Sequence, residues 1–452
     1  MDQTSVENSP VERPFTVSHR LVLSIAVPMT LAYLTTPLLG LVDVAVVGRL
    51  GDPALIGGLA VGAVIFDVVF TSFNFLRFST TGLVAQAFGR GDAREEQAVF
   101  WRSLAIGIVS GLLILALTPL VARAGLWAMG PEQDVQVAAH TYISIRMVCA
   151  PATLANYAIL GFLLGRGQAM TGLLLQTLIN GINIALSIYL GLVLEWGVAG
   201  VAWATVTGET VGALTGFVLV NLRFDRQAHP SLKRVFDRPA FVRLMSINRD
   251  IMIRSLALLL VFALFVRQGA QFGAVTLAAN AILLKFFMVA GYYLDGFANA
   301  AEQLAGRAIG ANHRPAFDRA VRLNVFWGTG LAALTSVFFL LFGEAVVDLM
   351  TTAEAVRAEA RRYIPWAAMT ALAGVLAFQM DGVFIGATWS RDMRNMMVLS
   401  LVLFVGLELV LVPLIGNHGL WLAFLAFLGA RGLFLYLLLG SRADVAFAHG
   451  DG

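Results

Sequence analysis

The sequence predicts an all-α polytopic membrane protein, with twelve transmembrane helices in two pseudo-symmetric six-helix lobes. The first reason is composition, because the 452 residues are 58% hydrophobic and 13% charged, about half the charged share of a soluble domain. The second is that apolar residues gather into long runs, and about 20 residues of helix cross a bilayer core. The third is an internal repeat that relates the two halves of the chain.

The predicted spans follow the apolar runs in chain order. They cover residues 21–47, 54–87, 98–121, 138–164, 169–194, 198–221, 249–268, 274–308, 318–342, 361–386, 395–414 and 419–440. The predicted lobes are 21–222 and 249–440, with a linker at 223–248 and tails at 1–20 and 441–452. Basic residues gather in the loops on one side of the predicted membrane, above all in the linker. The positive-inside rule therefore places the linker and both tails in the cytoplasm.

The first span, 21–47, carries a single charged residue, Asp43. A charge in the middle of a membrane helix costs about 3 kcal/mol by insertion scales, so it persists only with partners or with a proton that binds and leaves. Pro28, Pro37 and Gly40 lie in the same span, and each proline removes a backbone donor, so we expect this helix to bend. We interpret Asp43 as a group that couples an ion to a conformational change. The alternative is a structural acid that pairs with a neighbouring helix.

Shifting the chain by 221 residues aligns segments of the two halves. The shift lays Tyr142 on Tyr363, Gly161 on Gly382, Gly165 on Gly386, and the Ala87-x-Gly89 turn on Ala308-x-Gly310. Each half holds an even number of spans, so the two copies should run in the same direction, related by an axis along the membrane normal. Such pairs of bundles hold a cargo site between the halves and work by alternating access. Receptors and membrane enzymes with internal symmetry stay open as alternatives on the fold alone.

Polar residues recur on corresponding helices of the two halves. The second span carries Asn74, Arg77 and Thr81 on one face, and the eighth carries Asp295, Asn299 and Glu302 on one face. Polar groups that faced lipid would be left unsatisfied, so both stripes should face a watered cavity. We therefore interpret these helices as the walls of a substrate cavity.

Aromatic and thioether side chains lie close to the second stripe. Phe287, Met288 and Tyr292 suit wide, adaptable contacts with flat apolar or cationic molecules. The alternative for the aromatic residues is ordinary helix packing. For the two acids of the stripe, the alternative is an ion pair with Arg77 or Lys285.

The fifth and sixth spans carry the polar residues expected to surround Asp43. These candidates are Asn180, Asn183 and Ser187 on one face of the fifth span, and Thr205 and Glu209 one turn apart on the sixth. The remaining intramembrane acids, Asp67, Asp381 and Glu408, are interpreted as structural.

Several classes of function are disfavoured by what the sequence lacks. Its single cysteine, Cys149, excludes an internal disulfide and a cysteine metal cluster, and the six histidines lack the spacing of a helical zinc site. There is no HExxH, G-x-S-x-G or Walker-type motif, so we expect no enzyme, no cofactor and no nucleotide coupling. The expected partners are the lipid bilayer and small-molecule drugs or amphiphiles. We expect no nucleic acid partner, and a monomer.

Three segments carry a more specific pattern: VDVAVVGRLG at 42–51, FLRFSTTGLVAQAFG at 75–89 and LDGFANAAE at 294–302. With them the chain resembles the multidrug and toxic compound extrusion (MATE) family over about residues 15–445, and is most similar to its DinF-like branch. The resemblance implies a drug-resistance antiporter of the bacterial inner membrane. In such an antiporter, protons or sodium ions enter while cationic or amphiphilic compounds leave. By similarity, Asp43 matches the first-helix acid of the family, and Asn183 and Thr205 match the polar ring around it.

The chain departs from the family pattern at Ser187, where many relatives have an acid. Sodium prefers several hard oxygen ligands with compensating charge, whereas a proton needs one carboxylate in an apolar site. A lone Asp43 therefore favours the proton, and Glu209 keeps sodium open as an alternative. Glu408 lies at the repeat position of Ser187 in the second half. A lipid-linked precursor flippase of the same superfamily is the other alternative, although few basic residues lie within the spans.

Overall fold

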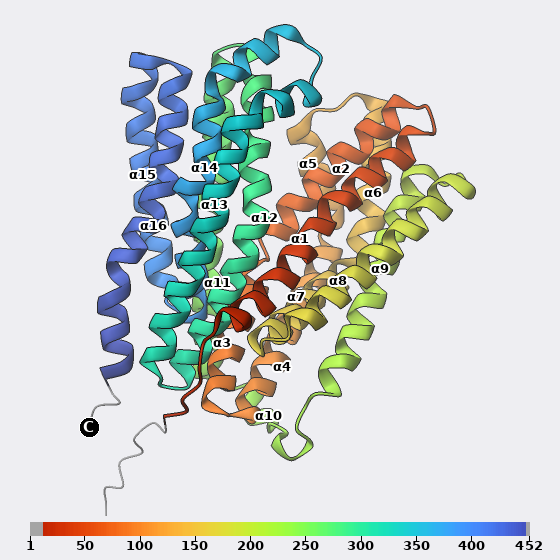
Figure 1. The fold of residues 1–452 in the computed structure, drawn as a ribbon. Helices are drawn as coiled ribbons and strands as arrows, with labels where there is room; N and C mark the ends of the chain where they lie inside the picture. Colours follow the sequence, from red (N-terminus) through yellow and green to blue (C-terminus); the bar gives the residue numbers. More distant parts are fainter. Residues whose placement is uncertain (1–11, 449–452) are drawn as a thin grey trace, which may run out of the picture. The chain divides into compact units, whose positions relative to one another are not determined.

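The computed structural model describes residues 12–448, and this part of the chain is all helical (Figure 1). The helices of the first half are α1 (His19–Gly48), α2 (Pro53–Thr71), α3 (Phe75–Arg90), α4 (Ala93–Ala116), α5 (Thr118–Met129), α6 (Gln133–Arg146), the 3₁₀ turn η1 (Met147–Cys149), α7 (Ala150–Gly165), α8 (Ala169–Ile188), the π-helical turn η2 (Tyr189–Val193) and α9 (Gly197–Asn221). Those that follow are η3 (Arg226–Ala228), α10 (Leu232–Val235), α11 (Arg238–Gln271), α12 (Ala274–Gly310), α13 (Arg314–Met350), α14 (Glu354–Gly386), α15 (Ser390–Ile415) and α16 (Asn417–Phe447).

Within residues 12–448, 11 helical stretches are long and apolar enough to cross a membrane. Eleven of the twelve predicted spans lie wholly or largely within these stretches, and the third, 98–121, runs from α4 across Leu117 into α5. The seventh predicted span, 249–268, lies in α11, a 34-residue helix outside this set whose first half carries four arginines and Asp250. Several helices continue well past the predicted apolar run, as α13 does beyond 318–342. The chain is thus an all-helical polytopic membrane protein, as predicted.

Some predicted spans are interrupted. The second, 54–87, was expected to be one helix, but α2 ends at Thr71 and α3 begins at Phe75, so Asn74 lies in the turn between them. The fourth, 138–164, changes to a 3₁₀ turn between α6 and α7, where Pro151 lies in the first turn of α7. Proline cannot donate to the preceding turn, which explains this joint. The turn after Thr71 contains neither proline nor glycine, so local sequence did not predict it.

The duplication is visible in where helices begin. Four pairs of helices start at residues that the 221-residue shift superimposes: Pro53 and Ala274, Ala93 and Arg314, Gln133 and Glu354, Ala169 and Ser390. In the second half, α12 corresponds to α2 and α3 together, and it runs without the interruption. The two halves therefore share one pattern of helices, with local differences.

The repeated glycines lie at equivalent close helix crossings. A Cβ atom on Gly161 of α7 would lie 2.7 Å from the carbonyl oxygen of Arg77 on α3. Its counterpart Gly382 of α14 approaches the carbonyl oxygen of Ala298 on α12, which is the repeat position of Arg77. Real Cβ atoms do not approach a carbonyl oxygen so closely, so only glycine fits at either crossing. The glycine match in the sequence thus reflects a shared packing contact.

The chain divides into two compact units. The C-terminal unit comprises the described parts of Met1–Thr30, Ala85–Asp92 and Arg249–Gly452, and the N-terminal unit comprises Leu31–Val84 and Ala93–Asn248. Residues 12–30 and the end of α3 therefore belong to the same unit as the second half, whereas the predicted lobes were contiguous in sequence. Parts of the predicted tails, residues 1–11 and 449–452, lie outside the described residues.

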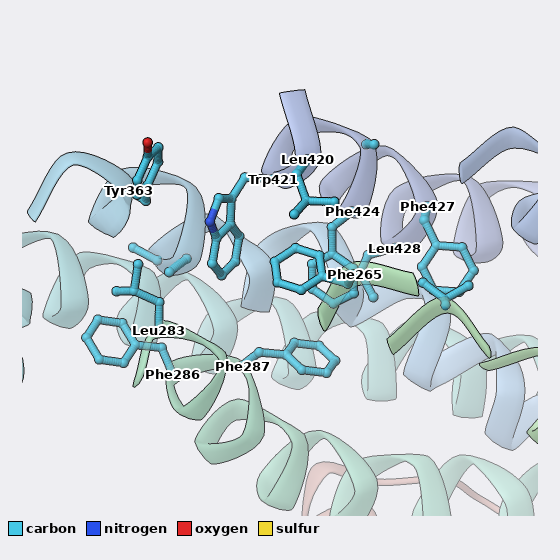
Figure 2. Close-up of a cluster of buried hydrophobic side chains, with 14 of the residues drawn as sticks. Phe265, Leu283, Phe286, Phe287, Tyr363, Leu420, Trp421, Phe424, Phe427 and Leu428 are labelled. Atoms are coloured by element: carbon cyan, nitrogen blue, oxygen red, sulfur yellow. The ribbon is translucent and has the colours of Figure 1, made fainter. Parts of the chain in front are cut away.

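Each unit has its own apolar core. In the C-terminal unit, aromatic side chains of α11, α12 and α16 pack together (Figure 2). Phe424 contacts the rings of Phe265 and Phe287, and Phe265 also contacts Trp421. In the N-terminal unit, one cluster surrounds Phe100 and Phe162, and a second joins α2, α6 and α7. A third, smaller cluster packs Val46 and Val47 of α1 around Tyr142.

Candidate ion-coupling site

Asp43 lies in the N-terminal unit, near the end of α1, and only 8% of its surface is exposed. α1 is a continuous 30-residue helix through Pro28, Pro37 and Gly40. Each proline removes one helical hydrogen bond, and no side chain lies where a Cβ of Gly40 would be. The helix therefore has three weak points before Asp43. Bending at these points stays a prediction.

The hydroxyl of Ser187 on α8 contacts Asp43 directly. Ser187 Oγ lies 3.0 Å from Asp43 Oδ1 and also 3.0 Å from Oδ1 of Asn183, one turn earlier on α8. Asn183 Nδ2 in turn donates to Thr205 Oγ1 on α9 over 2.9 Å, and Thr205 donates to the carbonyl oxygen of Val201. Asn183, Ser187 and Thr205 are 1%, 0% and 4% exposed. Four predicted residues thus form one buried chain of hydrogen bonds.

Close packing of α8 on α9 holds this chain of hydrogen bonds in place. A Cβ on Gly208 would lie 2.9 Å from the carbonyl oxygen of Ile179, and one on Gly212 would overlap the Ile179 side chain. The two helices can approach this closely only because both residues are glycine. As a result Thr205, one turn before Gly208, reaches Asn183.

The chain of hydrogen bonds can respond to a proton. A hydroxyl has one hydrogen, so Ser187 cannot donate to Asp43 and Asn183 at the same time. When Asp43 is ionised, Ser187 donates to it and the Asn183 carbonyl loses that donor. When Asp43 is protonated, its own O–H donates to Ser187, which then donates to Asn183. The same four side chains can therefore hold either state of Asp43, because the Asp43–Ser187 hydrogen bond reverses its direction and the Ser187–Asn183 hydrogen bond forms or is lost.

A second contact joins α1 to α8 two turns away. Asn180 Nδ2 donates to Thr35 Oγ1 over 2.6 Å, and Gln176 donates to Asn180 Oδ1 over 3.1 Å. Thr35 donates to the carbonyl oxygen of Ala32 in its own helix. Asn180 therefore contacts the same helix as Ser187 but outside the hydrogen-bond chain of Asp43. Sequence analysis did not select Thr35, although its position beside Pro37 was a usable signal.

Glu209 lies outside the hydrogen-bond chain of Asp43. Its carboxylate accepts a 2.7 Å hydrogen bond from Asn156 Nδ2 of α7, which also donates to the Glu209 carbonyl. A residue four positions after Thr205 is rotated by about 40° on the helix, enough to face a different neighbour. The structure thus brings Asp43, Asn183, Ser187 and Thr205 together, whereas Glu209 of α9 is bonded to Asn156 of α7.

Two of the predicted cavity residues, Asn74 and Arg77, belong to the N-terminal unit. Asn74 lies in the turn between α2 and α3, so the predicted stripe of Asn74, Arg77 and Thr81 does not lie on one unbroken helix. The Arg77 guanidinium lies 4.1 Å from the centre of the Phe78 ring. Thr81 is fully buried and donates to the Arg77 carbonyl.

The other predicted cavity residues lie on α12, in the C-terminal unit. Phe287 packs in the aromatic core beside Phe424 (Figure 2) and also contacts Phe262, as the alternative of ordinary helix packing describes. Met288 is half exposed, and Tyr292 is partly buried. The three residues of the predicted α12 stripe differ in exposure: Asp295 is exposed, whereas Asn299 and Glu302 are buried. Asn299 Nδ2 donates to the Asp295 carbonyl over 2.7 Å.

Asp381 is one of the acids interpreted as structural, and the structure places it in an ion cluster. Its Oδ2 accepts from Arg254 of α11 and, over 2.6 Å, from Arg431 of α16. All three side chains are buried. Among residues 12–448, no group of three or more histidine, cysteine or acidic side chains could hold a metal ion.

The fold and the duplicated helices define a polytopic α-helical membrane protein. A family model described as MatE matches residues 28–189 and 251–413. The chain belongs to the MATE family, and it is a transporter rather than an enzyme. The family predicted from the sequence is thus confirmed.

The relatives support the predicted branch. DNA damage-inducible protein F of Escherichia coli (strain K12) is 38% identical over 427 residues, which cover 93% of this chain and 92% of the relative. This likeness places the chain on the DinF-like branch. A probable multidrug resistance protein NorM of Rhizobium meliloti (strain 1021) is 26% identical over 443 residues, covering 92% of each chain.

Solved structures share the fold. A crystal structure described as MATE in the bent conformation has a TM-score of 0.87 and 18% identity, and covers 96% of this chain and 97% of its own. A second, described as MATE in the straight conformation, has a TM-score of 0.84 and 18% identity, covering 95% and 96%. At this identity the likeness carries the fold alone.

Proposed function

We propose that this transporter is a proton-coupled multidrug antiporter that exports cationic or amphiphilic compounds by alternating access. The observation that supports it best is the buried Asp43 at one end of a hydrogen-bond chain that fits both of its protonation states. A single carboxylate bonded to a hydroxyl and an amide is a poor site for sodium, which prefers several oxygen ligands with compensating charge. Relatives described as multidrug resistance proteins support the cargo class.

In the proposed cycle, Asp43 takes a proton from outside and becomes neutral. Ser187 then turns its hydrogen from Asp43 to Asn183, and α1 changes its bend at Pro28, Pro37 and Gly40. The cargo leaves during this change. The empty carrier turns inward, where Asp43 releases the proton. In this proposal the membrane is the bacterial cytoplasmic membrane, both termini lie in the cytoplasm, and one chain is the working unit.

The test is efflux of a small panel of dyes from proteoliposomes under an imposed pH gradient and, separately, an imposed sodium gradient. The wild-type chain should export dye with the pH gradient alone. Asp43→Asn should abolish this export while the protein still inserts and stays monodisperse. Asp134→Asn is the matched control, because it removes an exposed acid from the same unit. Export by the Asp43→Asn variant at the wild-type rate would refute the proposal.

One observation supports the sodium-coupled alternative: Glu209 supplies a second carboxylate in the same unit as Asp43. Export driven by sodium with no pH gradient would favour it. The flippase alternative makes a different prediction, since it requires transport of a lipid-linked pyrophosphate and no export of dyes.

A further inference from the structure

Side-chain hydrogen bonds fasten the linker to the N-terminal unit. Arg102 of α4 is 4% exposed, and its guanidinium donates to the carbonyl oxygens of Arg234 and Val235 over 2.7 and 2.8 Å. Arg102 and Arg234 also share the carboxylate of Glu95, at N–O distances of 2.8 and 3.2 Å. The short helix α10 is therefore held against α4 as a fixed part of the surface (Figure 1).

The first residues after α9 are held in a similar way. Gln97 of α4 donates to the carbonyl oxygen of Asp225 over 3.0 Å. Phe224, the residue before it, packs edge-on against Phe100 and Phe162 in the apolar core of the unit. Because both ends of the segment 222–236 are attached to the unit, the backbone from which its exposed side chains project has a defined position.

Large apolar side chains project from this fixed backbone. Leu222, Leu232 and Phe236 are 74%, 77% and 65% exposed. Leu232 and Phe236 are four residues apart, so they lie on the same side of α10. The preceding helix α9 is one of the stretches able to cross a membrane, and it ends at Asn221. These apolar side chains therefore follow directly where a membrane span ends, and holding them in water is unfavourable.

Basic side chains lie between these apolar residues. Arg226, Lys233 and Arg238 are exposed. Residues 222–238 contain five basic residues and two acids, so the segment carries a net positive charge. Asp225 accepts a hydrogen bond from the backbone amide two residues later, and Asp237 accepts one from the amide three residues later. The acids thus bind the backbone, and the exposed charge of the segment is mainly positive.

We propose that this segment binds the headgroups of anionic phospholipids through a surface that we call the linker face. It consists of Leu222, Arg226, Leu232, Lys233, Phe236 and Arg238. The apolar side chains enter the boundary between headgroups and acyl chains, while the cations meet the phosphates. A soluble anion or a nucleic acid would match the charge but would leave the apolar side chains in water. A lipid satisfies both, and this inference does not depend on which ion drives transport.

The experiment is native mass spectrometry of the detergent-purified full chain, titrated with phosphatidylglycerol and, separately, with phosphatidylcholine. The tightest-bound lipid should be phosphatidylglycerol, with a preference over phosphatidylcholine on the order of a hundredfold, about fivefold for each of the three exposed cations. Arg226→Gln/Lys233→Gln/Arg238→Gln should bind the two lipids alike. All three side chains are exposed, so the variant should stay folded and monodisperse.

Two matched variants separate the apolar and the charged contributions. Leu232→Ser/Phe236→Ser should weaken the binding of both lipids by the same factor and keep the preference. Arg123→Gln/Arg267→Gln/Arg362→Gln removes three exposed arginines that lie on α5, α11 and α14, outside the linker face. This control has the same loss of charge and should keep both the affinity and the preference of the wild type.

Three results would overturn the inference. The first is a wild-type chain that binds both lipids equally, and the second is a linker-face variant that keeps the preference. The third is a control variant that loses it as well, because the preference would then follow total charge rather than this surface. Excess inorganic phosphate should not displace phosphatidylglycerol. Displacement would assign the linker face to a soluble anion and would also overturn the lipid as its partner.

Discussion

Replacing Asp381 tests whether the C-terminal unit contains a second coupling acid. Two guanidinium groups, Arg254 and Arg431, share the Asp381 carboxylate, and the three side chains are 8%, 2% and 5% exposed. The cluster therefore carries one excess positive charge. Asp381→Asn leaves two uncompensated buried guanidinium groups, and removing one partner of a buried pair costs about 3–5 kcal/mol. For a unit of roughly 200 residues, this lowers the melting temperature by about 10 °C.

The assay is the thermal stability of the purified protein, followed by efflux under a pH gradient. Asp381→Asn/Arg431→Gln restores the net charge of the cluster and should recover most of the lost stability. The double variant should also keep Asp43-dependent efflux. Asp348→Asn is the control, because Asp348 and its partner Arg361 are each 37% exposed, and half-exposed pairs contribute about 1 kcal/mol or less. Normal stability with lost proton coupling in Asp381→Asn would show that Asp381 is a coupling residue and refute the structural reasoning.

Two further predictions concern the N-terminal unit. Gly40→Ala meets no atom within 4 Å of the new Cβ and gains about 1 kcal/mol of helix propensity. We expect the variant to keep its thermal stability and export dye more slowly; an unchanged rate would remove Gly40 from the residues that allow α1 to bend. Ser187→Asp sets a second carboxylate beside Asp43 and should make efflux respond to sodium, and a folded variant that ignores sodium would contradict the argument about ion choice.

The fold was largely predictable because a bilayer constrains helices by length and polarity alone. The apolar runs predicted the eleven helical stretches within residues 12–448 that are long and apolar enough to cross a membrane, and the repeat predicted which helices correspond. Helix ends were less predictable, since α13 continues as a helix after its apolar run ends. The break between α2 and α3 was missed, because the turn after Thr71 contains neither proline nor glycine, the residues that disfavour a helix most.

The candidate site was predictable only where several of its residues lie on one face of a single helix. The spacing of Asn180, Asn183 and Ser187 predicted that they share one helix face. In the structure Asn180 and Ser187 contact α1, whereas Asn183 donates to Thr205 of α9. Glu209 was grouped with them because sequence spacing does not say which of two neighbours a helix face meets. Thr35 was not selected, because its significance depends on Asn180 of another helix, and contacts between distant segments are not visible in a single sequence.

The most direct test of the account follows protons rather than dye. In proteoliposomes with a pH-sensitive dye inside, an outwardly directed ethidium gradient with no imposed ion gradient should drive protons inward through the wild-type chain. The Asp43→Asn variant should show no such movement. Equal proton movement in both proteins, or ethidium export that moves sodium instead of protons, would contradict the central claim that Asp43 carries the coupling proton.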